Sequence, residues 1–151
     1  MSSIIENMKL VFVQHVVCIN RGSLVTSFRI QQPYNAQQPE AGTSGNILYS
    51  QFRAIDLETL QFGEQPLEIS DWIRPIVSAV WGSEQAGPPV RYAPNGMTAV
   101  FEITGTPLNF RVDLQTILEP NQNVNSTHIG GLRAGSPSRR TICPLPVSST
   151  M

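Results

Sequence analysis

The sequence predicts an all-β fold, an antiparallel β-sandwich of about seven strands, immunoglobulin-like or jelly-roll-like, followed by an extended C-terminal arm. Three observations predict it. Apolar and polar residues alternate with a period of two in several short runs. Loops rich in Gly, Pro and Asn separate these runs, and no segment sustains a helical period. A small closed barrel is the alternative architecture.

The clearest strand pattern covers residues 97–114. Two alternating runs flank residues 105–107, which form a Gly-Thr-Pro turn signal. Pro107 lacks a backbone N–H and is therefore expected in the turn or at a strand start. Runs this close in sequence pair most simply as a hairpin. The apolar face of the second run is formed by Leu108, Phe110, Val112 and Leu114.

Five further runs have strand character, and they cover residues 10–19, 23–31, 47–57, 72–81 and 90–93. The first two are separated only by residues 20–22, so the chain is expected to open with a hairpin. The run 72–81 has a spacing that also fits a short buried helix. A strand is preferred because Pro75 in a helix interior would cost about 3 kcal/mol.

Three stretches between these runs are expected to be loops or irregular. Residues 32–46 and 82–89 have no periodicity and contain several Pro and Gly, which predicts long loops. Residues 60–71 are ambiguous. Within that stretch and just before it, acidic residues form a loose run whose simplest interpretation is a solvated rim.

The composition changes near residue 120. Residues 1–120 are predicted to form the β-sandwich body, and residues 121–151 an extended, polar and mildly basic arm. The arm carries three Arg and no acidic residue, whereas the body has more acidic than basic groups. A free segment of this composition cannot bury enough apolar surface to offset its loss of entropy. The opposite signs of body and arm therefore favour docking of the arm on a neighbouring copy.

The overall charge disfavours an electrostatic nucleic-acid binder. The net charge is -1, and charged residues make up only 14% of the chain, against about 25% in an average protein. Only Lys9 accompanies the Arg residues, and Arg is enriched over Lys at interfaces. The surface is therefore expected to be polar and uncharged, or partly hidden against other subunits.

No motif indicates an enzyme, a metal site or a cofactor. His15 and His128 are the only histidines, and neither lies at metal-ligand spacing from a cysteine. Cys18 lies in an apolar run and is expected to be a buried small hydrophobe, while a bridge to Cys143 is not expected. We therefore expect no catalytic residues, no metal ligands and no cofactor.

The predicted subunit interface has two parts. The arginines of the arm are expected to dock on an acidic group of the neighbouring body, because charges of opposite sign fix the orientation of a contact. The interface residues are Arg133, Arg139 and Arg140 on the arm, and Glu64, Glu68 and Asp71 on the body.

These features predict a non-enzymatic structural subunit that self-assembles. Its composition and extended arm are similar to those of small β-sandwich coat, cement and decoration proteins of viruses, and a cellular filament or shell is the other setting. The expected partners are copies of this chain and other structural proteins. No membrane partner is expected, and synthesis is expected in the cytoplasm, because no signal peptide or apolar span is evident.

A small lectin-like binding module is the alternative function. It would use the loops 32–46 and 82–89, with Trp81 and Tyr92 stacking on a ligand. Tryptophan in the core is the more common use of this residue in a sandwich, so this prediction depends on whether Trp81 is exposed.

Overall fold

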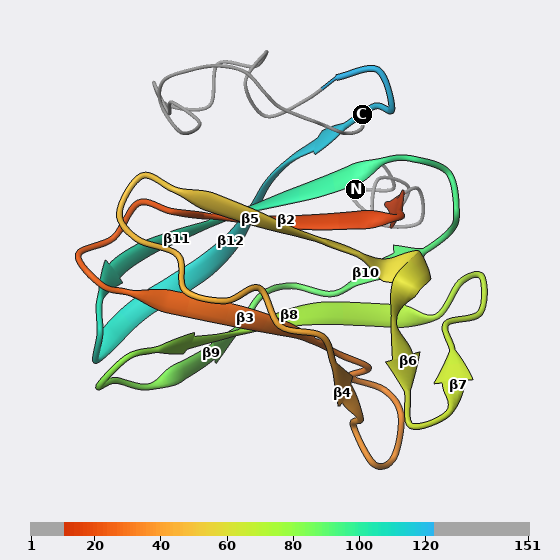
Figure 1. Cartoon of the computed structure of the whole chain (residues 1–151), viewed down its shortest axis with the longest axis horizontal. Coiled ribbons are helices and arrows are strands. Elements are labelled where there is room, and N and C mark those ends of the chain that lie inside the picture. Colours follow the sequence, from red (N-terminus) through yellow and green to blue (C-terminus); the bar gives the residue numbers. More distant parts are fainter. Residues whose placement is uncertain (1–10, 123–151) are drawn as a thin grey trace, which may run out of the picture.

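The protein is described by a computed structural model, which defines residues 11–122. The prediction of an all-β fold is confirmed, since the described chain contains twelve short and long strands and one turn of 3-10 helix. The strands form two main sheets, which Figure 1 shows as two stacked layers. The predicted arm lies almost wholly outside the described residues, so the boundary between body and arm stays a prediction.

The first layer is a six-stranded sheet with the order β1-β10-β8-β3-β4, and β9 pairs with β8 beside this path. Its strands are β1 (Phe12–Val13), β3 (Thr26–Gln31), β4 (Glu40–Ala41), β8 (Trp72–Ala79), β9 (Glu84–Ala86) and β10 (Val90–Tyr92).

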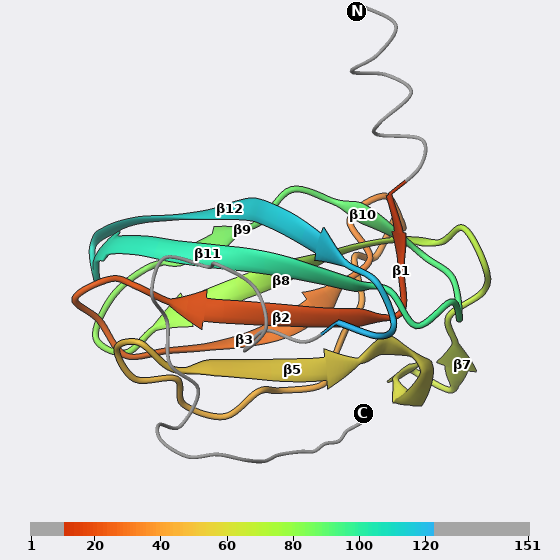
Figure 2. The same cartoon turned by 90° about the horizontal axis from the view of Figure 1, so that it is seen from above.

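The second layer is a four-stranded sheet with the order β12-β11-β2-β5 (Figure 2). Its strands are β2 (His15–Asn20), β5 (Phe52–Asp56), β11 (Thr98–Thr106) and β12 (Asn109–Leu118). The 3-10 turn η1 (Leu57–Thr59) and a small hairpin of β6 (Gln61–Phe62) and β7 (Gln65–Pro66) follow β5. The stretch 60–71, which the sequence left ambiguous, therefore contains a hairpin.

The prediction of purely antiparallel sheets is wrong, because each main sheet contains one parallel pair. β2 runs parallel to β11, with His15 opposite Thr98, and β1 runs parallel to β10. The other strand pairs of the described chain are antiparallel. The predicted β11–β12 hairpin is among them and is confirmed, with Pro107 in its turn.

The predicted opening hairpin is also wrong. β2 and β3 belong to different sheets, so the chain crosses between the layers after Asn20 instead of reversing within one sheet. The predicted first strand is divided as well, because β1 ends at Val13 in one sheet and β2 begins at His15 in the other. Local turn signals indicated a reversal at residues 20–22 but carried no information about which sheet receives the next strand.

Pro75 lies within β8, which confirms the strand predicted for this run. On one side β8 pairs continuously with β3. On its other side β8 pairs with β10 at Trp72 and Ile73 and with β9 from Ile76 onward. Pro75 falls between these two partners, so its missing N–H interrupts no ladder, as expected for proline within a sheet.

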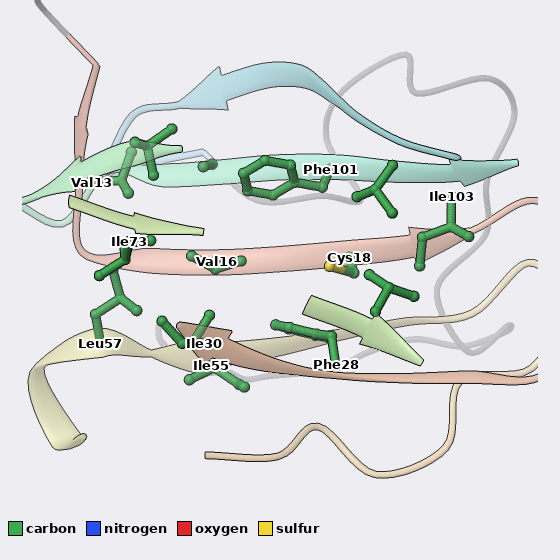
Figure 3. Close-up of a cluster of buried hydrophobic side chains, with 14 of the residues drawn as sticks. Val13, Val16, Cys18, Phe28, Ile30, Ile55, Leu57, Ile73, Phe101 and Ile103 are labelled. Carbon is green, nitrogen blue, oxygen red and sulfur yellow. The ribbon is translucent and has the colours of Figure 1, made fainter. Parts of the chain in front are cut away.

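The main core lies between the two layers, and Figure 3 shows side chains from both sheets meeting there. Val16, Cys18 and Phe101 project from the four-stranded sheet toward Phe28 and Ile73 of the other sheet. All five are almost completely buried. Burying one such aliphatic or aromatic side chain contributes about 1.5–3 kcal/mol, so the shared core holds the layers together.

A second apolar cluster lies on the opposite face of the four-stranded sheet. Its buried members are Val17, Ile19, Val100 and Leu118, and Phe52 packs against them. They alternate along β2 and β11 with the inward-facing core residues. We call this set the outer patch.

Candidate interaction surfaces

The acidic residues predicted to receive the arm lie near the β6–β7 hairpin and the start of β8. Glu64 lies in the β6–β7 turn, and Glu68 and Asp71 lie in the following loop. The Asp71 carboxylate accepts a hydrogen bond from the backbone N–H of Glu68 at 2.9 Å and one from the Gln32 side chain at 3.4 Å. Asp71 thus holds a turn together, which leaves Glu64 and Glu68 as the exposed acidic groups.

The arm residues Arg133, Arg139 and Arg140 lie outside the described part of the chain, as do His128 and Cys143. His15 lies in β2, with its Nε2 at 3.7 Å from an Asp56 carboxylate oxygen, and both side chains are about one-third exposed. Among residues 11–122 there is no group of three His, Cys, Asp or Glu side chains that could hold a metal ion.

The two aromatic residues predicted to stack on a ligand are not brought together. Trp81 lies in the β8–β9 turn and is 93% exposed, whereas Tyr92 lies in β10 and is buried in the main core. Burial raises the pKa of the Tyr92 hydroxyl, and the negative charges of Glu58 and Asp56 raise it further. Tyr92 is therefore a core residue.

A different aromatic cluster lies on the outer face of the six-stranded sheet. Phe12, Arg91 and Trp72 are direct neighbours across β1, β10 and β8. The Arg91 guanidinium carbon lies 4.5 Å from the Trp72 ring centroid and 5.9 Å from that of Phe12. The Tyr34 ring meets Trp72 edge to face, with a centroid distance of 5.6 Å. We call these four residues the aromatic row.

The aromatic row could not be found from sequence spacing. Its members come from four segments, and only the register of β1 and β8 on either side of β10 aligns them. Tyr34 itself lies in the loop 32–46, which the sequence had suggested as a binding loop.

A charged network covers the same face beside the aromatic row. Arg29 on β3 forms ion pairs with Glu40 and with Glu84, the latter at 3.0 Å, and donates to the Ser78 hydroxyl at 2.9 Å. The Ser78 hydroxyl in turn donates to Glu84 at 2.9 Å. The hydrogen bond from Ser78 and the charge of Arg29 lower the pKa of Glu84, while the hydrogen bond to Glu40 raises that of Arg29.

Large apolar side chains gather at one end of the molecule. Trp81 and Val80 lie in the β8–β9 turn, and Leu108, 77% exposed, lies in the β11–β12 turn. Leu48 and Tyr49, in the segment before β5, are exposed near the end of β2. Figure 1 shows these turns at the same end, on the left. We call the five residues the apolar tip.

The apolar tip is held in place by backbone contacts between its turns. The N–H of Ser83 donates to the Pro107 carbonyl at 3.1 Å, and the N–H of Val80 donates to the Val25 carbonyl at 2.9 Å. A Cβ on Gly82 would lie 2.3 Å from the Pro107 oxygen, so this contact requires glycine. Trp81 has a positive φ of 62°, an unfavourable value for a bulky residue. The turn therefore holds an indole out in solvent at a conformational cost.

Comparison with known proteins gives only distant structural likeness. No protein-family model matches the chain, and no curated protein matches its sequence. Two structures of pneumolysin are similar at TM-scores of 0.37, with 14% and 13% identity over 71% and 70% of this chain. The chain spans about a quarter of the length of pneumolysin, 24% and 23% in the two structures. No helix within residues 11–122 is long and apolar enough to cross a membrane.

Proposed function

We propose that this protein is a non-enzymatic structural subunit, a β-sandwich that self-assembles as the subunits of a virus coat or of a cellular shell or filament do. The apolar tip carries the proposal. Exposed large apolar side chains that gather at one end of a molecule mark a surface that a partner covers. Tryptophan and tyrosine are also enriched at the centres of interfaces.

The low charge of the chain supports an assembly of identical copies. Charged residues are depleted in the cores of interfaces, and only 14% of this chain is charged. The arm is proposed to add to this contact, with Arg133, Arg139 and Arg140 docking on Glu64 and Glu68 of a neighbouring copy. Such a contact would strengthen the assembly and weaken with salt.

Light scattering on the full-length chain tests the proposal. We expect a mass of several copies for the wild type and a smaller mass for Trp81→Asn/Leu108→Asn, because asparagine tolerates the positive φ at position 81 while removing the apolar surface. Ile69→Asn is the matched control, since Ile69 is 65% exposed but lies outside the apolar tip. A wild type that is monomeric at all concentrations would refute self-assembly.

The arm has a separate test in the same experiment. Arg133→Gln/Arg139→Gln/Arg140→Gln keeps the length of the arm and removes its charge. We expect the assembly of this variant to be weaker than that of the wild type at low salt and equal to it at high salt. An equal mass at both salt concentrations would remove the arm from the interface and leave the apolar tip as its only part.

A lectin-like binding module is the second candidate, and the aromatic row favours it. Tyr34 is 70% exposed beside Trp72, and aromatic faces of this kind stack on the apolar faces of sugars. A glycan that binds there should change tryptophan fluorescence in a saturable way. The change should persist in Trp81→Phe and disappear in Trp72→Phe, and the opposite pattern would exclude the aromatic row.

A further inference from the structure

Three arginines lie on the outer face of the six-stranded sheet, and only one of them has carboxylate partners. Arg29 forms ion pairs with Glu40 and Glu84. Arg91 and Arg74 form no ion pair with any of residues 11–122. Both alternate along their strands with core residues, so both side chains point outward, beside the aromatic row. Two positive charges on this face are therefore not neutralised by the described chain.

The Arg91 guanidinium is positioned by aromatic rings instead of by a carboxylate. It stacks on Trp72 and lies within reach of Phe12, at 4.5 and 5.9 Å from the ring centroids, where a ring attracts a cation. Its Nε has no hydrogen-bond partner among residues 11–122. Stacking engages the faces of the guanidinium plane, whereas the N–H donors point outward from its edges. The terminal N–H groups of a positioned Arg91 thus remain available to a ligand.

Arg74 places a second positive charge next to the aromatic row. It follows Trp72 by two residues on β8, so the two side chains share one face. Its Nε donates to the Gln31 side chain at 2.7 Å, which orients Arg74 without removing its charge. Because Trp72 lies opposite Arg91, Arg74 is the diagonal neighbour of Arg91, a separation of about 7–8 Å. Both arginines therefore flank the same tryptophan.

Tyr34 adds an exposed ring to this arrangement. Its side chain is 70% exposed and meets Trp72 edge to face at 5.6 Å between centroids. The aromatic row thus presents an apolar ring face, a phenol hydroxyl and the terminal donors of Arg91 at one place. Sites for small organic ligands combine aromatic surfaces with a few well-placed polar groups in this way.

We propose that the aromatic row binds a sugar that carries a carboxylate, such as a hexuronic acid. The sugar ring stacks on the exposed face of Tyr34, and the Arg91 guanidinium holds the carboxylate through two parallel hydrogen bonds. Arg74 adds a second positive charge beside the carboxylate. The proposal names a ligand class for the second candidate function and rests on that binding role, whereas it does not depend on self-assembly.

The charge of the described chain favours a single acidic sugar over a long polyanion. Residues 11–122 contain six basic and ten acidic side chains, so a nucleic-acid strand or another extended polyanion would meet a net negative molecule. Affinity for nucleic acid also depends on many phosphate contacts. This face offers two arginines without a carboxylate partner, Arg91 and Arg74, which suffice for one carboxylate but not for a chain of phosphates.

Fluorescence of the full-length Trp81→Phe variant tests the proposal, because Trp72 is then its only tryptophan. D-glucuronate and D-glucose are titrated at constant ionic strength. The two sugars share a ring and differ at C6, where glucuronate has a carboxylate. We expect glucuronate to bind with a Kd at least about tenfold lower than that of glucose, since a bidentate hydrogen bond to a charged group is stronger than a neutral one.

Substitutions in the same background identify the residue that recognises the carboxylate. Arg91→Gln should bind the two sugars about equally. Arg111→Gln is the matched control, because it removes the same charge from a side chain that is 78% exposed on the other sheet, and it should keep the preference. Arg91→Lys is the second variant if circular dichroism shows that Arg91→Gln does not fold. It should lose most of the preference, since an ammonium group lacks the planar fork.

Four results would overturn the proposal. Equal binding of the two sugars by the Trp81→Phe variant would exclude the carboxylate contact and leave a lectin-like function for neutral sugars. No saturable response to either sugar would refute that function as well. A preference that survives in the Arg91 variants, or disappears equally in Arg111→Gln, would place the recognition elsewhere. Acetate that displaces glucuronate at equal concentration would show that the sugar ring makes no contact. Light scattering on the same samples reports self-assembly separately.

Discussion

Asn20 joins the two layers through its side chain. The amide is completely buried and donates to the carbonyls of Leu24 at 2.7 Å and Ile47 at 2.9 Å, while its oxygen accepts from the N–H of Gly22 at 2.9 Å. One side chain thus bonds three backbone groups, of which Gly22 and Leu24 lie in the crossing between β2 and β3 and Ile47 lies in the segment before β5. Buried backbone groups left without a partner are costly.

Asn20→Ala should therefore destabilise the protein by about 2–3 kcal/mol, because it leaves the Leu24 carbonyl and the Gly22 N–H without a partner. The Ile47 carbonyl loses one of two bonds, since it also accepts from the N–H of Thr26 at 3.2 Å. Urea unfolding followed by circular dichroism measures the change. Asn35→Ala is the control, since the exposed Asn35 side chain accepts only one hydrogen bond, from the N–H of Gln37. An equal loss for the two variants would contradict this role of Asn20.

Thr26 carries a buried hydroxyl group that makes no hydrogen bond to the described residues. Its side chain is fully buried, and its hydroxyl has no hydrogen-bond partner among the described residues. Thr26→Val removes the hydroxyl at nearly constant volume and should stabilise the protein by about 1 kcal/mol. Thr26→Ser keeps the hydroxyl, loses a methyl group and should destabilise it. The midpoint of thermal unfolding distinguishes the two, and a lower midpoint for the valine variant would contradict the prediction.

The Cys18 thiol should make the free energy of unfolding fall as the pH rises above about 9. Burial raises the pKa of its thiol well above the ordinary value of 9.0. Above pH 9 the unfolded chain loses this proton while the folded chain keeps it, so stability falls by up to about 1.4 kcal/mol per pH unit from this group. The loss continues until pH passes the folded pKa.

Cys18→Ala should reduce the alkaline slope of the unfolding free energy, measured by urea titration between pH 8 and 11. Some slope should remain, because the pKa of the Tyr92 hydroxyl is raised from 10.0. A slope identical to that of the wild type would show that the thiol does not stay protonated in the fold.

Among the elements, the β11–β12 hairpin depends on one glycine. Gly105 has a φ of 120°, and a Cβ there would lie 2.4 Å from the Asn109 carbonyl oxygen. Gly105→Ala should cost more than about 2 kcal/mol, because the backbone must shift at a position where L-residues are already strained. Gly45→Ala is the control for positive φ alone, since nothing lies within 4 Å of its Cβ position. Equal losses would show that the close approach at Gly105 is unimportant.

Strand positions followed from alternation, but strand partners did not. The runs containing β11 and β12 were predicted because their apolar residues repeat at every second position, and the run containing β8 because Pro75 would break a helix. The pairing of β2 with β11 was not predictable, since local turn signals favour neighbours in sequence. Residues 10–19 are apolar at nearly every position, which is typical of a strand buried on both faces. This pattern is the one sequence feature that indicated the outer patch.

The candidate surfaces were predictable only in part. The lectin-like function required Trp81 to be exposed, and Trp81 is exposed in the structure. The aromatic row could be found only from the strand register, which the sequence does not give. Tyr92 looked equivalent to Trp81 in sequence, but its place on the inner face of β10 buries it. Alternation indicates that two faces exist, and only the packing of the layers decides which face is inside.

For the whole molecule, the shared core predicts a single cooperative unfolding transition. Both tryptophans lie on the six-stranded sheet or its turns, whereas Cys18 lies in the four-stranded sheet. In the Cys143→Ser variant, tryptophan fluorescence and reactivity of Cys18 therefore report the two layers separately. We expect their midpoints in urea to coincide. Separate midpoints would mean that one layer survives without the other.

The parallel pairing of β2 with β11 has a consequence for how the chain is made. His15 meets Thr98, about 80 residues later in the sequence, and such distant contacts slow folding because a long loop must close first. A nascent chain emerging from the ribosome has its second strand long before the partner exists. The apolar residues of β2 then stay without their final neighbours through most of synthesis, which is when chaperones would be needed.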